Sequence, residues 1–287
     1  MIAVLKHELR GYFYSLAAYL FCAFLLAFIG VGAMLYNIQS SVANFELVLK
    51  FVCIGLVIIL PVLTMRVIAE EKKQKTDQLL YALPLKPLQI ILGKYFALLL
   101  IFLIPIMIIA VYPLVFARFG EVYLPTAYGS LLAFYLLGAA IIAIGMFISS
   151  LTENQGFAAG ISIPFLLLNF YSVKLAEHIS STPFGTLVAL SVLVAAIALV
   201  VRHLTKNENL SYSIFLAGIL CLGITFFFNS ALFEGLLPKV MAQLSLFNRF
   251  YIFVDGVFDL TAVVFFLSVI IFFLFLSTQS LEKRRYN

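Results

Sequence analysis

No charged side chain occurs from Gly11 to Phe45, and similar apolar runs follow along nearly the whole length of the chain. A helix needs about 20 apolar residues to cross roughly 30 Å of hydrocarbon. Eight runs meet or approach that length: 14–36, 47–65, 95–117, 127–150, 156–173, 183–201, 210–231 and 258–278. None of them alternates polar with apolar residues, as the wall of a membrane barrel must. The sequence therefore predicts an all-α, polytopic transmembrane bundle of about eight spans.

Composition supports the same class of protein. The chain is 64% hydrophobic and 11% charged, whereas soluble domains carry roughly 25% charged residues. A chain so poor in charge must have lipid as its main solvent, so we read the net charge of +5 as a topology signal and not as nucleic-acid binding. The first apolar run is too long for a cleaved signal peptide and is expected to stay as a membrane helix. The three scattered cysteines, Cys22, Cys53 and Cys221, are expected to be buried and reduced.

The positions of Lys and Arg predict the orientation. With the N-terminus in the cytosol, the inner segments hold 13 of the 18 basic residues and the outer segments hold 5. The inner residues are Lys6, Arg10, Arg66, Lys72, Lys73, Lys75, Lys86, Lys94, Arg202, Lys206, Lys283, Arg284 and Arg285, and the outer ones are Lys50, Arg118, Lys174, Lys239 and Arg249. We expect a multi-pass protein of a bacterial-type cytoplasmic (inner) membrane with both termini in the cytosol. If 156–173, the shortest run, did not cross, the C-terminal basic cluster would lie outside, against this bias.

We expect a single membrane domain over 1–287. Within it we distinguish an N-terminal elbow helix (1–13), a cytosolic coupling elbow (66–94), an extra helix pair (174–237) and an outer interfacial helix (238–256). In the last of these, apolar residues follow helical spacing, a pattern that fits an interfacial or re-entrant helix and an ordinary packed loop equally well. They are Val240, Leu244, Phe247 and Tyr251.

Residue types that carry chemistry are sparse. No span has an ionisable group near its centre, which argues against an ion-coupled carrier or a channel with a charged filter, although not against one built on backbone carbonyls. The three histidines, His7, His178 and His203, lie far apart, and no metalloprotease, serine-hydrolase or phosphate-loop motif is present. We therefore expect no catalytic residue, no metal site and no cofactor in this chain. Any nucleotide that drives it must be hydrolysed by another chain.

The segment 65–94 is a charged island between two apolar runs. Its pattern predicts a helix over Arg66–Leu83 lying along the inner surface, although a solvated loop is the plain alternative. Two ion pairs are expected on its polar face, Glu71 with Lys75 and Glu70 with Lys73, each contributing about 0.2–0.5 kcal/mol.

Two prolines set the limits of this helix and of the next one. Pro84 lacks an N–H and disfavours helix at the residue before it, so the first helix should end there. Pro87 suits the first turn of the following helix, which rises into the third span. The product is a short elbow that is mechanically continuous with two membrane helices.

This segment resembles the permease subunits of type-2 ATP-binding-cassette (ABC) exporters, most closely the class associated with gliding motility. The resemblance is carried by Thr64-Met65-Arg66, Glu70-Glu71, Thr76, Leu79-Leu80, Pro84 and Gly93-Lys94. The stretches LKHELRGYFYSLAAYL, ISSLTENQ, LSLFNRFYIFVDGVFDLTAVVFFLS and LEKRR are also similar to that class. Together the similar parts cover about 1–173 and 238–285. Family members usually have six spans, so the helix pair 174–237 is a departure.

The resemblance implies a non-catalytic half-transporter that pairs with a second permease, identical or sibling, and with two ATPase subunits that hold ATP and Mg²⁺. It places the residues that couple the chain to the ATPase on the elbow: Arg66, Glu70, Glu71, Thr76, Pro84, Gly93 and Lys94. The first and fifth spans would line the interface between permeases and the substrate route, with Gly156, Gly160 and Asn169 there. For the two glycines alone, packing within the chain is the preferred interpretation, because glycine is common in membrane helices.

A cargo route is expected along uncharged residues, and such a route favours lipid-like, peptide or drug-like cargo. These residues are Thr64, Ser149, Ser150, Ser162 and Asn169. A stand-alone carrier or channel and a non-transporting membrane scaffold are the rival hypotheses, with an intramembrane enzyme a distant third. The identity of the cargo, the direction of transport and the identity of the second permease stay open at this point.

Overall fold

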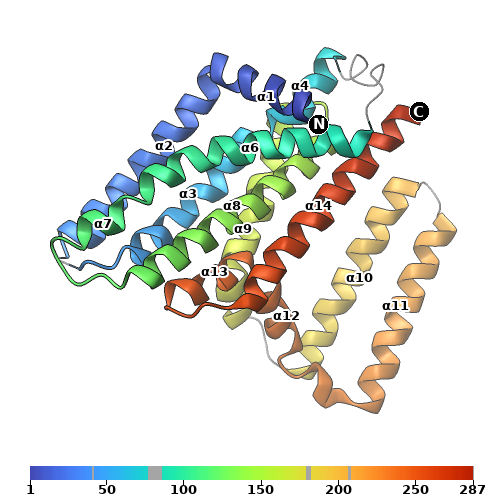
Figure 1. Cartoon of the computed structure of the whole chain (residues 1–287). Helices are drawn as coiled ribbons and strands as arrows, with labels where there is room; N and C mark the ends of the chain where they lie inside the picture. Colours follow the sequence, from blue (N-terminus) through green and yellow to red (C-terminus); the bar gives the residue numbers. More distant parts are fainter. Residues whose placement is uncertain (41, 77–85, 179–181, 206–207, 287) are drawn as a thin grey trace. The chain divides into compact units, whose positions relative to one another are not determined.

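The computed structural model describes residues 1–40, 42–76, 86–178, 182–205 and 208–286 (Figure 1). Every regular element within these ranges is a helix, and no strand occurs among them. The all-α fold expected from the sequence is confirmed.

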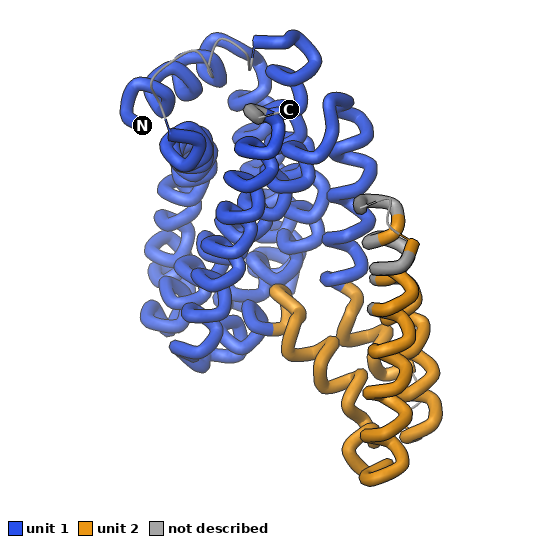
Figure 2. Tube along the Cα trace, turned by 90° about the vertical axis from the view of Figure 1, so that its right-hand side faces the viewer, with its two compact units in different colours: residues 1–170, 249–287 blue, residues 171–248 orange. Residues whose placement is uncertain are grey.

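The chain divides into two compact units (Figure 2). The first comprises Met1–Phe170 and Arg249–Asn287, and the second comprises Tyr171–Asn248. The helices expected as an extra pair over 174–237 lie in the second unit.

In chain order the elements begin with α1 (Ile2–Tyr14), α2 (Leu16–Ala33), a short π-helix (Met34–Ile38), α3 (Glu46–Thr64) and α4 (Arg66–Gln74). They continue with α6 (Pro87–Ile109), α7 (Tyr112–Phe116), α8 (Leu124–Leu151) and α9 (Gln155–His178). The second unit holds α10 (Pro183–Thr205), α11 (Glu208–Phe228), a 3₁₀ turn (Ser230–Phe233) and α12 (Leu236–Leu244). The chain closes with α13 (Leu246–Val254) and α14 (Leu260–Tyr286). The segment expected as one outer helix is thus two short helices, because the backbone is extended at Ser245.

Seven helices in the described ranges are long and apolar enough to cross a membrane. They are Leu16–Ile38, Glu46–Gln74, Pro87–Phe116, Leu124–Leu151, Gln155–His178, Ser211–Phe228 and Leu260–Arg284. The run 156–173, the weakest on length alone, lies in a full-length helix. The run 183–201 is also helical, as part of α10, and its stretch Pro183–Val192 is apolar but shorter than a span. The chain is a multi-pass membrane protein.

Helix α8 is the core of the first unit. It is the most buried of the seven helices and packs against α3, α6 and α14. Two of its glycines allow this close approach. A methyl group on Gly138 would lie 2.2 Å from the Phe102 ring, and one on Gly145 would lie 2.1 Å from Thr64 Oγ1. Small residues therefore let α6 and α3 lie directly on the α8 backbone.

The two ends of the first unit differ in polarity. At one end, which we call the ion-paired end, the buried Lys94 of α6 pairs with Glu8 of α1 and Glu71 of α4, and the more exposed Arg284 of α14 pairs with Glu153, just beyond α8. At the other end, α13 packs onto the core through the Phe250 ring, whose centroid is 6.0 Å from that of Phe134. Lys50 lies over the Tyr251 ring there, 5.0 Å from its centroid.

Candidate coupling site

Helix α4 follows α3 directly, with only Met65 between them. Pro61 removes one hydrogen bond from the last turns of α3, and the Met65 N–H still donates to the Pro61 carbonyl at 2.8 Å. The helix ends at Gln74, because Lys75 adopts a left-handed conformation (φ 57°) and Thr76 N–H donates back to the Glu71 carbonyl. The expected end near Leu83 was therefore wrong. Pro84, expected to stop the helix, lies outside the described residues.

A serine from another helix caps the start of α4. Ser149 Oγ, near the end of α8, accepts hydrogen bonds from the Ile68 and Ala69 N–H groups at 3.3 and 3.1 Å, and it donates to the Met65 carbonyl at 3.0 Å. The first N–H groups of a helix have no partner within the helix. The α8 hydroxyl fills that role here, so it ties α4 to the core.

The last carbonyls of α8 strengthen this tie. Lys72 on α4 donates to the Ser150 carbonyl, and Ser280 Oγ on α14 donates to the same oxygen at 3.1 Å. Arg284 on α14 pairs with Glu153, just beyond α8, at 2.7 Å. The end of α8 is thus a junction where α4 and α14 meet.

This junction changes one expectation. Four residues expected along a cargo route lie inside the single chain: Thr64, Ser149, Ser150 and Ser162, each at most 2% exposed. They are not available on its surface in this conformation, so they do not fit a route between two permeases.

Lys94 is the centre of a second junction. Its side chain is 2% exposed, and its Nζ lies 2.7 Å from Glu8 Oε1 and 2.6 Å from Glu71 Oε1. It also donates to the Val67 carbonyl at 3.2 Å. One ammonium therefore joins α1, α4 and α6. We expected Lys94 to face the ATPase, but the structure places it inside, as a connector.

Gly93 next to it explains how α1 reaches this position. A methyl group on Gly93 would lie 3.0 Å from Val4 of α1 and 3.2 Å from the Met1 carbonyl. The absence of a side chain lets α1 lie directly on the first turns of α6. Gly93 is thus a packing residue, and its partner helix is the N-terminal elbow.

The ion pairs of α4 differ from those expected. Glu70 pairs with Arg66 through both guanidinium contacts, at 3.0 and 3.3 Å, and Glu71 pairs with Lys94. The expected partners, Lys73 and Lys75, are exposed. A rule based on spacing within one helix cannot detect a partner that comes from another helix, so no sequence pattern indicated Glu8 or Ser149.

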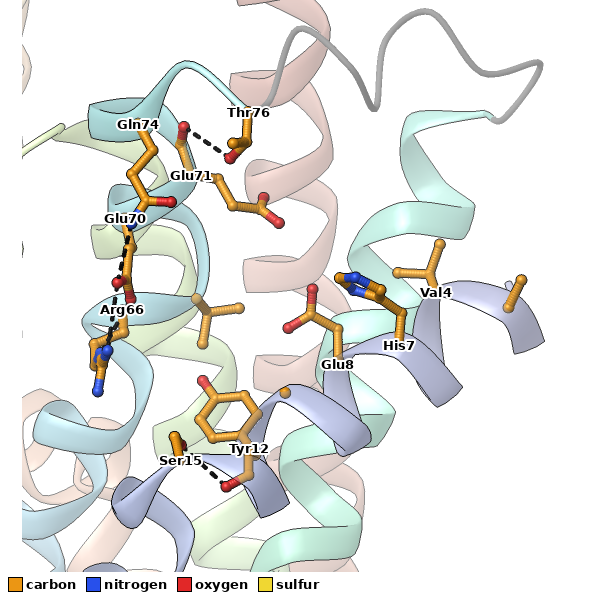
Figure 3. Close-up of a pocket in the computed structure, with 13 residues that line it drawn as sticks. Val4, His7, Glu8, Tyr12, Ser15, Arg66, Glu70, Glu71, Gln74 and Thr76 are labelled. Atoms are coloured by element: carbon orange, nitrogen blue, oxygen red, sulfur yellow. Dashed lines mark hydrogen bonds and ion pairs between the residues drawn. The ribbon is translucent and has the colours of Figure 1, made fainter.

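A cavity of about 920 Å³, which we call the α1–α4 cavity, lies between α1 and the segment from the end of α3 to Thr76 (Figure 3). Its walls carry Ala3, Val4, His7, Glu8, Gly11, Tyr12, Ser15, Arg66, Val67, Glu70, Glu71, Gln74 and Thr76. The carboxylates of Glu8 and Glu71 reach into it from opposite sides (Figure 3).

Tyr12 closes the cavity where α1 passes the end of α3. Its hydroxyl donates to the Leu63 carbonyl at 3.4 Å. Burial, together with the nearby carboxylate of Glu8, raises the pKa of Tyr12 well above its usual range, so the hydroxyl stays protonated. The wall therefore presents a fixed hydrogen-bonding group beside its acidic side chains.

The residues expected at a permease interface lie elsewhere, on α9. Gly156 and Gly160 are exposed, and a methyl group on Gly160 would meet nothing within 4 Å. Asn169 is half-buried. The two glycines are therefore not used for close packing within the first unit. Among the described residues, no three His, Cys, Asp or Glu side chains gather as metal ligands do.

A comparison with protein families matches residues 33–175 to the ABC-2 family transporter protein model. The matched range includes α3, α4, α6 and α8, and with them Lys94, Glu71 and Ser149. No curated protein matches the chain. Residues 33–175 are thus similar to the ABC-2 family transporter protein, and the match supports a multi-pass membrane permease of an ABC transporter.

Proposed function

We propose that the chain is the membrane-spanning subunit of an ATP-driven exporter, in which a separate ATPase subunit pushes on α4 at the ion-paired end. The observation that carries the proposal is the attachment of α4. It is continuous with α3, capped by Ser149 of α8 and ion-paired to Lys94 of α6. A displacement of α4 would therefore act on three spans at once.

The attachments are of a kind that transmits force. The Ser149 hydroxyl and the Lys94 ammonium are both buried, and leaving a buried polar group without its partner costs about 1–3 kcal/mol, or more for a charge. Sliding α4 past its neighbours is thus disfavoured relative to moving them together. Helix α4 would therefore transmit a displacement to the bundle as a rigid element.

Charge supports a cytosolic position for this end. Lys6, Arg10, Lys73, Lys75 and Lys86 all lie on α1, on α4 or beside them, and basic residues favour the cytosolic side of short loops. Both termini would then be cytosolic, in a cytoplasmic membrane, on the side where ATP is available. Assignment to the gliding-motility class rests on the resemblance in sequence alone.

A second permease is part of the proposal. The exposed Gly156 and Gly160 on α9 leave a narrow face on which another helix could lie closely. Export belongs to the proposal as well. A carrier acting alone is the main rival, because a route built on backbone carbonyls needs no ionisable residue.

Reconstitution tests the proposal. The chain would be purified with its associated ATPase, placed in lipid nanodiscs and assayed for ATP hydrolysis. We expect hydrolysis to depend on the chain, and Ser149→Ala to change this dependence while the complex stays assembled. Transport by the chain alone in liposomes, with no ATPase bound, would support the carrier in its place.

A further inference from the structure

Three carboxylates line the α1–α4 cavity, those of Glu8, Glu70 and Glu71, and the imidazole of His7 lines it as well. Arg66 and Glu70 pair with each other. Glu8 and Glu71 share one ammonium, that of the buried Lys94.

The carboxylates of Glu8 and Glu71 are partly sheltered from solvent. Glu8 is 15% exposed and Glu71 is 25% exposed, so bulk water screens them only in part. Only one oxygen of Glu8, Oε1, contacts Lys94, and its carboxylate extends into the cavity (Figure 3). A second cation brought into the cavity would meet a carboxylate already held in place.

The cavity has room for such a group. Its volume, about 920 Å³, is in the range of about 300–1,000 Å³ typical of small-molecule pockets. Much of the wall along α1 is apolar or small, at Ala3, Val4 and Gly11. The stem of a long basic side chain would pack against this wall while its head reached Glu8.

We propose that a basic side chain of the ATPase subunit, most suitably an arginine, enters the α1–α4 cavity and pairs with Glu8 beside Lys94. This inference rests on the proposed function and adds the chemistry of the contact. An arginine fits because its planar guanidinium can bind a carboxylate through two hydrogen bonds. Docking would then add a second cation at the junction of α1, α4 and α6, so the ATPase would hold α1 and α4 together.

The first test compares two variants that each remove one negative charge at the same end. Glu8→Gln leaves Lys94 paired with Glu71, so the fold keeps a balanced pair and the melting temperature should change little. Glu153→Gln removes the partner of Arg284, outside the cavity. We expect Glu8→Gln to weaken binding of the purified ATPase at least ten-fold and to flatten its salt dependence, and Glu153→Gln to leave both nearly unchanged.

The second test locates the contact by photo-crosslinking in the assembled complex. Benzoylphenylalanine at Tyr12 faces the cavity, and at Phe13 it faces an apolar groove against α6. We expect the Tyr12 probe, and not the Phe13 probe, to capture an ATPase peptide that contains arginine or lysine. Changing that residue to glutamate should abolish binding, and Glu8→Lys should restore it in part.

The outcomes separate this inference from the function on which it rests. Wild-type affinity of the ATPase for Glu8→Gln, or crosslinks from Tyr12 to lipid alone, would overturn the inference and leave the exporter proposal standing. Failure of any ATPase to bind the unaltered chain would overturn the exporter proposal itself.

Discussion

Lys94 is placed where a lysine is costly unless it is paired, at the start of a membrane helix and away from water. An unpaired charge in such surroundings is strongly destabilising, whereas a well-paired one is tolerated. Its two carboxylate partners come from α1 and α4, which are 63 residues apart in the chain at Glu8 and Glu71. The Lys94 side chain thus holds both α1 and α4 against α6.

Replacing Lys94 by methionine should therefore destabilise the chain. The variant keeps most of the side-chain volume but removes the cation that the Glu8 and Glu71 carboxylates share. We expect a loss of roughly 3 kcal/mol, read as a melting temperature lower by several degrees in nanodiscs. Lys73→Met, at an exposed position on α4, should have almost no effect.

A triple variant tests the physical cause. If the loss in Lys94→Met comes from the uncompensated carboxylates, adding Glu8→Gln and Glu71→Gln should recover part of the stability. A triple variant that is less stable than Lys94→Met would show that packing, and not charge, explains the effect.

Sequence reasoning found most residues of this site but not what they do. Glu70, Glu71, Gly93 and Lys94 lie in or beside a charged interruption between apolar runs, and their expected role came from the resemblance to type-2 ABC exporters. Their partners could not be found in this way, because Glu8 and Ser149 are distant in sequence and carry no local pattern. Helical spacing predicted that Glu71 pairs with a lysine one turn away on α4. Glu71 pairs instead with Lys94 of α6, because a buried ion pair between helices gains more than an exposed pair within one helix.

At the scale of elements, α4 depends on α8 for its cap. The Ser149 hydroxyl binds the Ile68 and Ala69 N–H groups, and both residues are buried, so water cannot replace the hydroxyl easily. Ser149→Ala should cost about 1–3 kcal/mol and loosen the joint between α4 and the core. Hydrogen exchange of the 66–74 amides should rise several-fold.

Ser162→Ala is the matched control. Ser162 is equally buried, but its hydroxyl bonds only to the Ala158 carbonyl of its own helix. This substitution should leave exchange at 66–74 unchanged. Equal exchange in the two variants would contradict the idea that Ser149 caps α4.

A second prediction at the scale of elements concerns the glycines of α8. Gly138→Ala places a methyl group 2.2 Å from the Phe102 ring, so α6 must move away, at a cost of about 1–3 kcal/mol. Gly160→Ala on α9, where a methyl group meets nothing within 4 Å, should be neutral or slightly stabilising in the single chain. Thermal unfolding of the two variants in the same detergent would compare them, and equal melting temperatures would contradict the packing argument.

Of the three scales, the secondary-structure elements were predicted best from the sequence. Length and hydropathy alone located the membrane helices, because lipid allows few other backbone arrangements. Helix ends that depend on the local backbone conformation were not predicted. α4 ends at Lys75 through a left-handed residue and not at a proline, and the outer segment divides at Ser245. Neither position has the glycine that usually marks such a break.

On the scale of the whole molecule, the family match and the division into units nearly coincide. The match ends at residue 175, and the second compact unit begins at Tyr171. The return to the first unit, from Arg249 onward, brings α14 back to the ion-paired end, where Arg284 meets Glu153. In sequence, the second unit is thus an insertion between the two segments that make up the first unit.

The proposed orientation gives the last prediction. In a background with Cys22, Cys53 and Cys221 replaced, a cysteine at the exposed position Lys75 should react with a membrane-impermeant maleimide only after the cytoplasmic membrane is opened. A cysteine at the exposed position Phe119, at the opposite end of the first unit, should react in intact spheroplasts. The reason is the excess of Lys and Arg around α1 and α4, which favours the cytosolic side. The reverse pattern would place the α1–α4 cavity away from ATP, and no cytosolic ATPase could then reach it.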